Sequence, residues 1–296
     1  MEERTLFTPN PFQKSQLKCF SAANIPTYLF RVVAPGTAGS TSMSTITSKA
    51  LSDPECSNHP DDIFRLNPTN AAALIHAHFE WKCGEKCNFI SWTSSLLFAL
   101  HYGLYRHRND HDKPDLSRIL IYILDTSGLS EGTLIKDLDI LDAFKRESAG
   151  LNDFLHMRRG QDQKRYYFGE YITQGQLEID GRCASVSLQQ MIELGLFELH
   201  PGLSDKDRWG SLAKRVLELR RESTSSHTTT PAEIRRAITI AQCCFGDRWV
   251  VPLSAMLLAL RPRAQDNAKI AAAYSAIFAG ESRTFFEDFI PFIDIS

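Results

Sequence analysis

The 296-residue chain lacks several features that identify common classes of protein. No apolar run approaches the ~20 residues that a transmembrane helix needs, so we expect no membrane span. The first four residues, Met1–Arg4, are acidic overall and open no apolar core, so no secretory signal is predicted. The net charge is only −2, which gives no general argument for binding nucleic acid or an anionic membrane surface.

Two widespread catalytic motifs are also missing. The glycine-containing segment Gly36–Ser40 lacks the lysine of a P-loop and the helix that should follow it. No Gly-x-Ser-x-Gly nucleophile elbow is present either, which argues against a Ser/His/Asp hydrolase. The chain also contains no internal repeat.

Cysteine is present, but in a number that argues against a disulfide framework. Seven cysteines in a large chain without a predicted signal indicate reduced thiols, and hence a cytoplasmic or nuclear location. The hydrophobic fraction of 43% and the charged fraction of 23% are typical of a globular protein.

The stretch Asn88–Tyr102 organises the rest of the chain. Apolar residues run into a cluster of hydroxyls, and an alanine-containing apolar pattern of helical period follows. This order predicts a strand, a tight polar junction and a helix. Ile90 and Trp92 should face the opposite side of the strand from Ser91.

Further β-rich runs and helical patterns suggest two parts. We predict a mixed α+β domain over residues 1–204 and a helical appendage over residues 205–296, which could bind a protein partner. Arg31 lies on a half-buried strand face, where its charge needs a partner. The expected strands are 27–33, 117–125, 166–172 and 176–179, the segment 37–62 is expected to be a loop, and the main expected helices are 71–82, 205–222, 231–245, 249–260 and 264–279.

Three strand residues, Arg31, Ser91 and Glu170, follow one another in the order Arg, Ser, Glu. They lie in Leu-Phe-Arg-Val, Phe-Ile-Ser-Trp-Thr and Phe-Gly-Glu-Tyr-Ile. This order resembles the Arg–Ser–Glu class of ADP-ribosyltransferases, which includes the cholera-toxin-like and heat-labile-enterotoxin-like A chains. The resemblance covers about residues 27–180 and implies a split, mostly antiparallel sheet with flanking helices. The Ser-Trp-Thr-Ser-Ser stretch also resembles an uncharacterised fungal domain, which implies no function.

The resemblance implies that NAD is the substrate and gives each residue a role. Glu170 would stabilise the oxocarbenium-like transition state that forms when nicotinamide leaves the ribose. Arg31 would bind the phosphate oxygens of NAD. Ser91 would orient Glu170 and Thr93 would support it. The aromatic ring that stacks on nicotinamide is left open among four residues: Phe89, Trp92, Tyr166 and Tyr167.

The sequence departs from the pattern of that class at two positions. Trp92 replaces the middle threonine of the Ser-Thr-Ser motif. Phe168 stands two residues before Glu170, where arginine-modifying members have Glu or Gln. This difference argues against arginine as the acceptor and leaves another protein or nucleic-acid acceptor, or water. The alternative is an inactive domain of this type that serves as a protein-interaction module.

A basic and aromatic segment precedes Glu170 and would form the acceptor-recognition loop by resemblance. It could contact a nucleic-acid acceptor, but Asp162 and two glutamines dilute its charge, so we favour a solvated loop. Its members are Arg158, Arg159, Lys164, Arg165, Tyr166 and Tyr167.

Four residues of types that suit zinc precede the central strand: His76, His78, Cys83 and Cys87. His76 and His78 are two positions apart on an expected helix and should point to different sides. Cys83 and Cys87 could instead form a disulfide or remain two free thiols. We therefore predict no metal site.

Overall fold

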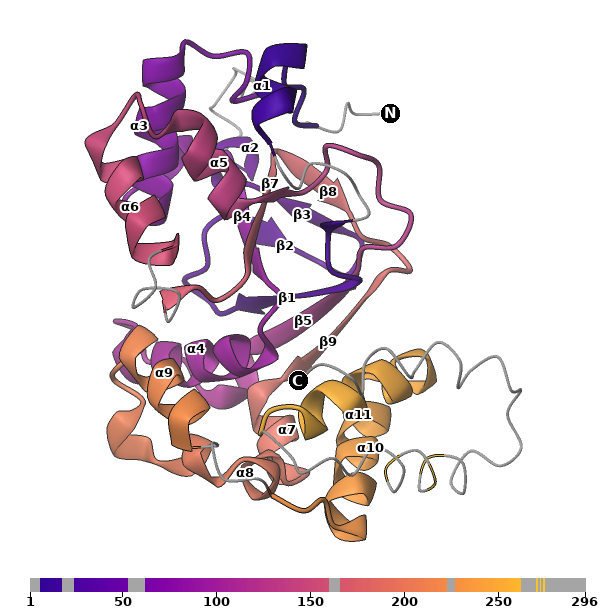
Figure 1. Cartoon of the computed structure of the whole chain (residues 1–296). Helices are drawn as coiled ribbons and strands as arrows, with labels where there is room; N and C mark the ends of the chain where they lie inside the picture. The colour runs from indigo at the N-terminus through magenta and orange to yellow at the C-terminus, as the bar shows by residue number, and fades with distance from the viewer. Residues whose placement is uncertain are drawn as a thin grey trace. The chain divides into compact units, whose positions relative to one another are not determined.

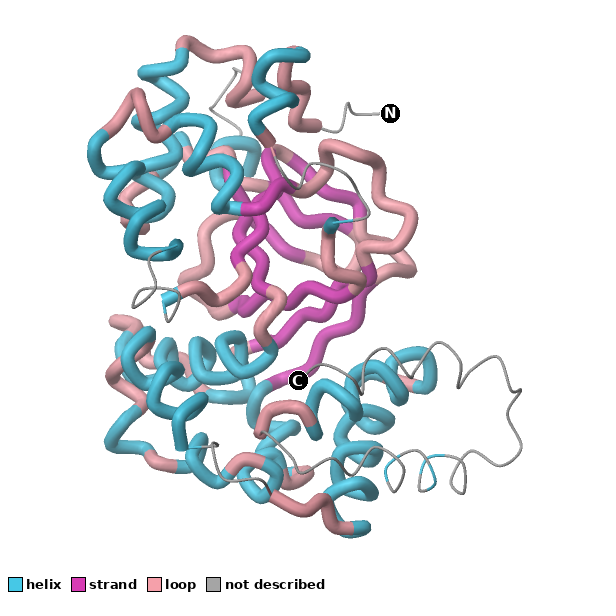
Figure 2. Tube along the Cα trace, in the orientation of Figure 1, coloured by secondary structure: helices cyan, strands magenta, loops and turns pink. Residues whose placement is uncertain are grey.

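A computed structural model describes residues 6–17, 24–52, 62–159, 166–222 and 227–261, together with Ile270, Ala272 and Tyr274. The chain divides into two compact units. The first consists of Met1–Ser95 and Tyr122–Ala184, and the second of Leu96–Ile121 and Ser185–Ser296. Figures 1 and 2 show the course of the chain and its helices and strands.

The fold class is mixed α+β, as predicted. A six-stranded sheet has the order β6-β7-β4-β1-β5-β9, and a three-stranded sheet has the order β2-β3-β8. Pairing is antiparallel between β1 and β4, β4 and β7, and β6 and β7, and also throughout the small sheet. The strands are β1 (Tyr28–Val33), β2 (Ser40–Thr41), β3 (Thr45–Thr47), β4 (Phe89–Thr93), β5 (Leu120–Asp125), β6 (Ile135–Lys136), β7 (Glu170–Gln174), β8 (Gln176–Glu178) and β9 (Cys183–Ser187).

The α-helices are distributed over both units. The first unit contains α1 (Pro11–Gln16), α2 (Lys49–Ser52), α3 (Pro68–Phe79), α5 (Asp137–Phe144) and α6 (Ala149–Arg159). The second contains α4 (Leu96–Asn109), α7 (Leu188–Glu193), α8 (Leu196–Leu199), α9 (Ala213–Glu222), α10 (Pro231–Phe245) and α11 (Val250–Leu258). None of the described helices is long and apolar enough to cross a bilayer.

Strand β4 separates two hydrophobic cores of the first unit. Phe89 packs with side chains of α3, α5 and α6, which lie together beside β4 and β7 in Figure 1. Ile90 and Trp92 pack on the other side with residues of β3 and β8. Successive side chains of a strand point to opposite faces, so β4 contributes to both cores, as the sequence predicts for Ile90 and Trp92.

Two local features differ from the sequence-based expectations, and a third expectation is not tested. The segment expected to be a loop over 37–62 contains β2, β3 and α2, because strands this short give no alternation that a sequence reveals. Helix α3 begins at Pro68, and the Asn67 side chain caps it by accepting a hydrogen bond from the Thr69 amide. The expected helix at 264–279 lies almost entirely outside the described residues.

The division of the chain also differs from the predicted boundary at residue 204. Residues 204 and 205 both belong to the second unit, and so does α4. Helix α4 packs against α9, and α10 packs against α11. The change in composition near residue 203 marks a more polar segment, whereas the partners of α4 depend on long-range packing that composition does not report.

Candidate functional site

The pairing of β4 with β7 brings Ser91 and Glu170 together. Thr93 lies opposite Glu170, and Ser91 lies opposite Ile172. Ser91 and Glu170 are therefore diagonal neighbours on one face of the sheet. The Ser91 hydroxyl donates a hydrogen bond to Oε1 of Glu170 over 2.8 Å. Two of the three residues singled out by the resemblance are thus in direct contact.

Arg31 joins this pair through the backbone of β4. Its Nη1 donates a hydrogen bond to the carbonyl oxygen of Ser91 over 3.0 Å. This contact supplies a partner for the charge on the half-buried face of β1. The guanidinium also restrains the segment of β4 that carries the Ser91 side chain.

Thr93 and Gly169 form a tight junction at the ends of β4 and β7. The Thr93 hydroxyl donates to the carbonyl oxygen of Phe168 over 2.6 Å and accepts from the amide of Ser95 over 3.0 Å. The Ser94 amide donates to the carbonyl oxygen of Gly169 over 2.8 Å. Gly169 has a φ of +68°, and a Cβ there would lie 2.0 Å from the Ser94 hydroxyl oxygen. Both the positive φ and this contact favour glycine as the residue before Glu170.

The second carboxylate oxygen of Glu170 is bound by Arg158, which extends from α6. Nη2 of Arg158 lies 3.0 Å from Oε2 of Glu170, and Nη1 forms a short ion pair with Asp137. The guanidinium also lies over the ring of Phe79, 4.6 Å from its centroid. Arg158 therefore bridges two carboxylates against an aromatic surface.

The electrostatics of this bridge follow from its burial. The Asp137 side chain is fully buried, and burial raises its pKa to about 7 although Arg158 acts in the opposite direction. Burial alone would lower the pKa of Arg158, but the charges of Glu170 and Asp137 outweigh it and raise that pKa. Arg158 thus remains a cation between the two acids.

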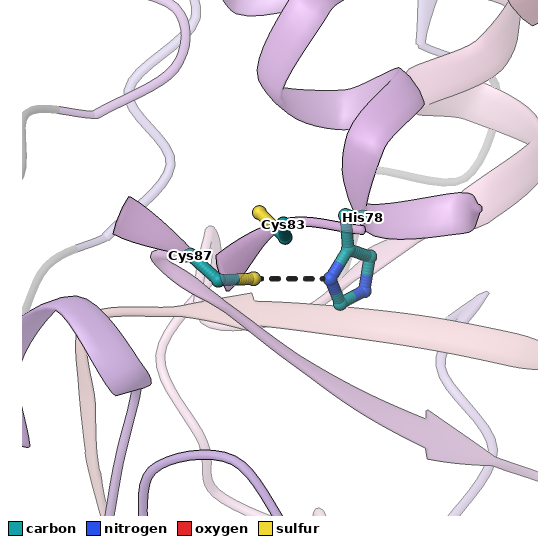
Figure 3. Close-up of side chains that lie close together, drawn as sticks. All are labelled: His78, Cys83 and Cys87. Carbon is teal, nitrogen blue, oxygen red and sulfur yellow. Dashed lines mark hydrogen bonds between the residues drawn. The ribbon is translucent and has the colours of Figure 1, made fainter. Parts of the chain in front are cut away.

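His78 connects the Ser91–Glu170 pair to two cysteines. Its Nε2 lies 2.8 Å from the Ser91 hydroxyl oxygen, and its Nδ1 lies 3.3 Å from Sγ of Cys87. Cys83 lies beside them, and the ligand atoms of all three side chains are within 4.8 Å of one another. In Figure 3 the Cys87 sulfur points at the His78 ring.

The two thiols differ in the direction in which their pKa values are shifted. A hydrogen bond from Cys83 lowers the pKa of Cys87 to about 5, and His78 contributes in the same direction against the effect of burial. The same hydrogen bond, together with burial, raises the pKa of Cys83. The pair therefore readily holds one thiolate, which is the form of cysteine that binds metals and attacks electrophiles.

The aromatic candidates for stacking occupy different environments. Phe89 and Trp92 are only 6% and 2% exposed and lie in the two hydrophobic cores. Tyr167 is half-buried with Lys136 over its ring, whereas Tyr166 is 40% exposed. Tyr166 is therefore the most exposed of the four residues.

The basic segment before Glu170 separates into different parts. Arg158 and Arg159 belong to the last turn of α6 and are engaged in ion pairs. Lys164 and Arg165 lie outside the described residues.

His76, the remaining zinc candidate, faces Phe154 rather than the cysteines, with ring centroids 5.9 Å apart. His76 and His78 thus point to different sides of α3, as their spacing predicts.

Sequence reasoning missed the roles of Arg158, Asp137 and His78 beside Ser91 and Glu170. Asp137 is the first residue of a helix, where an acid is common because it interacts favourably with the helix dipole. In the sequence, Arg158 is one of several basic residues in the last turn of a helix, where such residues are usually solvated. The spacing of His78 from Cys83 and Cys87 indicated that these three residues could lie together. Pairing His78 with His76, which points to another side of α3, argued against zinc.

Comparison with known proteins gives one match. No curated protein and no solved structure matches the chain. A family described as a domain of unknown function, DUF7587, matches residues 24–178, which is more than half of the chain. This range contains Arg31, Ser91 and Glu170, as well as His78 and both cysteines. The chain belongs to the DUF7587 family.

Proposed function

We propose that the first unit cleaves NAD at the Ser91–Glu170 pair and transfers ADP-ribose to an acceptor or to water. The observation that supports this proposal is the hydrogen bond of 2.8 Å from the Ser91 hydroxyl to Oε1 of Glu170, with Arg31 bound to the Ser91 carbonyl oxygen. Three residues that lie far apart in the sequence, and that resemble the Arg–Ser–Glu class, are thus connected by two hydrogen bonds.

The reaction breaks the bond between C1′ of the ribose and the nitrogen of nicotinamide. The bonding electrons leave with nicotinamide, and the ribose develops the positive charge of an oxocarbenium ion. The Glu170 carboxylate stabilises this charge and accepts a hydrogen bond from a ribose hydroxyl. A nucleophile then forms the new bond to C1′ and releases its proton to solvent.

The surrounding residues would hold the carboxylate and the substrate. Ser91 orients Glu170, and Thr93 fixes the backbone of Phe168 beside it. Arg31 positions β4 and supplies a cation for the phosphates of NAD. The exposed ring of Tyr166 is the aromatic surface that we assign to nicotinamide, because Phe89 and Trp92 are buried in the cores.

Three acceptors fit the proposed reaction: water, a protein and a nucleic acid. Phe168 occupies the position at which arginine-modifying transferases carry Glu or Gln, so we propose water or a non-arginine protein or nucleic-acid acceptor. We propose a cytoplasmic or nuclear setting for this activity, because an odd number of cysteines, seven, suits thiols that stay reduced.

A second function is favoured by Arg158. Its guanidinium lies 3.0 Å from Oε2 of Glu170, so both oxygens of the proposed catalytic carboxylate already have partners. A ribose hydroxyl would have to share or displace this ion pair. If Arg158 stays in place, the first unit is an inactive domain of this type that acts as a protein-interaction module, with the C-terminal helices as further binding surface.

Nicotinamide release from NAD by the purified protein tests the proposal. Glu170→Gln should reduce release by about 100-fold or more, because it removes the charge that stabilises the transition state. Glu178→Gln on β8 is the matched control and should retain activity. No release by the wild-type protein, together with no NAD binding by calorimetry, would refute the enzymatic function and support the interaction module.

A further inference from the structure

The cluster of His78, Cys83 and Cys87 has no part in the proposed reaction, yet it contacts the residues that do. We propose that these three side chains bind one Zn²⁺ and that the bound ion positions Ser91 through the His78 ring. Zinc binding does not depend on the proposed function, and its test requires no NAD.

The distances suit a tetrahedral ion. Zn–S bonds of about 2.3 Å and Zn–N bonds of about 2.0–2.1 Å require S···N separations of about 3.5 Å and an S···S separation of about 3.8 Å. Nδ1 of His78 lies 3.3 Å from Sγ of Cys87. Since all three ligand atoms lie within 4.8 Å of one another, shifts of about 1 Å or less complete the site.

The local backbone brings the three ligands together. Cys83 and Cys87 flank a single 3-10 turn, Gly84–Lys86, in which Gly84 has a φ of +57°. This turn places both sulfurs on the side of His78, which lies one residue before the end of α3. Cys87 is 7% exposed, whereas Cys83 and His78 are half-buried. The site is therefore anchored in the core, and water can fill the fourth position.

The donor set selects the class of metal. Thiolate and imidazole ligands suit Zn²⁺ and other borderline or soft ions, whereas Mg²⁺ and Ca²⁺ prefer oxygen ligands. A disulfide between Cys83 and Cys87 would consume the same two sulfurs, so oxidation and metal binding exclude each other.

The second nitrogen of His78 gives the ion its proposed effect on Ser91. When Nδ1 binds the metal, the proton must lie on Nε2, which then donates to the Ser91 hydroxyl oxygen 2.8 Å away. Ser91 must in turn donate its own proton to Oε1 of Glu170. Ring nitrogens opposite a metal usually make such an orienting hydrogen bond. Without a metal, Nε2 still donates to Ser91, because the Ser91 proton is directed at Glu170. The ring is then held on its other side only by the contact of 3.3 Å between Nδ1 and the Cys87 sulfur, which restrains its orientation less than a metal bond.

Metal content tests the site directly. Protein reduced with a phosphine and exposed to Zn²⁺ should retain one ion per chain after dialysis, measured by mass spectrometry of the metal. Cys83→Ser and His78→Ala should abolish retention. The matched controls are His76→Ala, two residues earlier on α3, and Cys183→Ser, which should both retain the ion. Circular dichroism confirms that each variant is folded.

Two further measurements keep the test decisive. Substitution with Co²⁺ in the wild-type protein should give thiolate-to-cobalt charge-transfer bands and the visible bands of a tetrahedral site. Ser91→Ala should weaken zinc binding by about 10-fold, as loss of an orienting partner does. The site would be refuted if His76→Ala lost as much zinc as His78→Ala. It would also be refuted if the wild-type protein bound no zinc when its thiols are reduced. Unchanged affinity in Ser91→Ala would overturn the positioning role.

Discussion

Replacing Arg158 with methionine should destabilise the first unit more than replacement of any exposed arginine. The change keeps an apolar side chain against Phe79 but removes the guanidinium, which contacts both Asp137 and Glu170. The Asp137 side chain is fully buried. Removal of one partner from a buried ion pair leaves an uncompensated charge, which costs about 3–5 kcal/mol.

The size of this effect should depend on pH. Burial raises the pKa of Asp137 to about 7 in the wild-type protein, so stability from this group is complete below the unfolded pKa of about 4 and is lost as pH rises towards 7. Without Arg158 the pKa of Asp137 rises further. The cost of Arg158→Met should therefore be larger at about pH 8.5 than at about pH 5.5, by about 1.4 kcal/mol for each unit of further shift.

Urea unfolding followed by circular dichroism at the two pH values provides the measurement. Arg159→Met is the control, because Arg159 is adjacent on α6 and pairs with Asp142 while its side chain is 34% exposed. Such a pair should contribute less than about 1 kcal/mol. Equal destabilisation by the two substitutions, or a cost of Arg158→Met that does not vary with pH, would refute the reasoning.

Three other substitutions test separate features by the same unfolding measurement. Gly169→Ala places a Cβ 2.0 Å from the Ser94 hydroxyl oxygen at a φ of +68°, and should cost about 1–3 kcal/mol; if Ser94→Gly does not restore part of this loss, the clash is not its cause. Burial lowers the pKa of His200 to about 4, so its neutral form contributes stability above the unfolded pKa of about 6.5 that is lost as pH falls towards 4, about 3 kcal/mol in all. His200→Leu should flatten the pH profile over that window, and an unchanged profile would contradict this assignment. Thr230→Ala removes the capping box of α10 and should cost about 1 kcal/mol, whereas the exposed Thr239→Ala should cost less.

The strand residues of the site could be predicted because they lie on short, strongly patterned segments. Alternation in Phe89–Thr93 separates Ser91 from Trp92, and the structure has them on opposite faces. The apolar runs around Arg31 and Glu170 likewise predict strands, and β1 and β7 place both residues on strands, although β7 begins at Glu170 rather than at the predicted residue 166.

The residues contributed by helices could not be predicted in the same way. Arg158 is 12 positions from Glu170, and its contact depends on how α6 packs on α3 and α5. Helical periodicity identifies a buried face, but it does not say which strand residue that face meets. His78 reaches Ser91 for the same reason, since α3 covers the β4 face that carries Phe89.

The two faces of β4 also constrain how the length of the chain can change. A one-residue insertion just before Phe89 that shifted the strand by one position along β7 would exchange the faces. Ile90 would then take the place of Ser91 beside Glu170, and the serine would take the place of Trp92 in an apolar core. Strand β4 should therefore tolerate conservative substitutions far better than a shift of its register against β7. Natural variation in chain length should fall outside it, in the turns at either end.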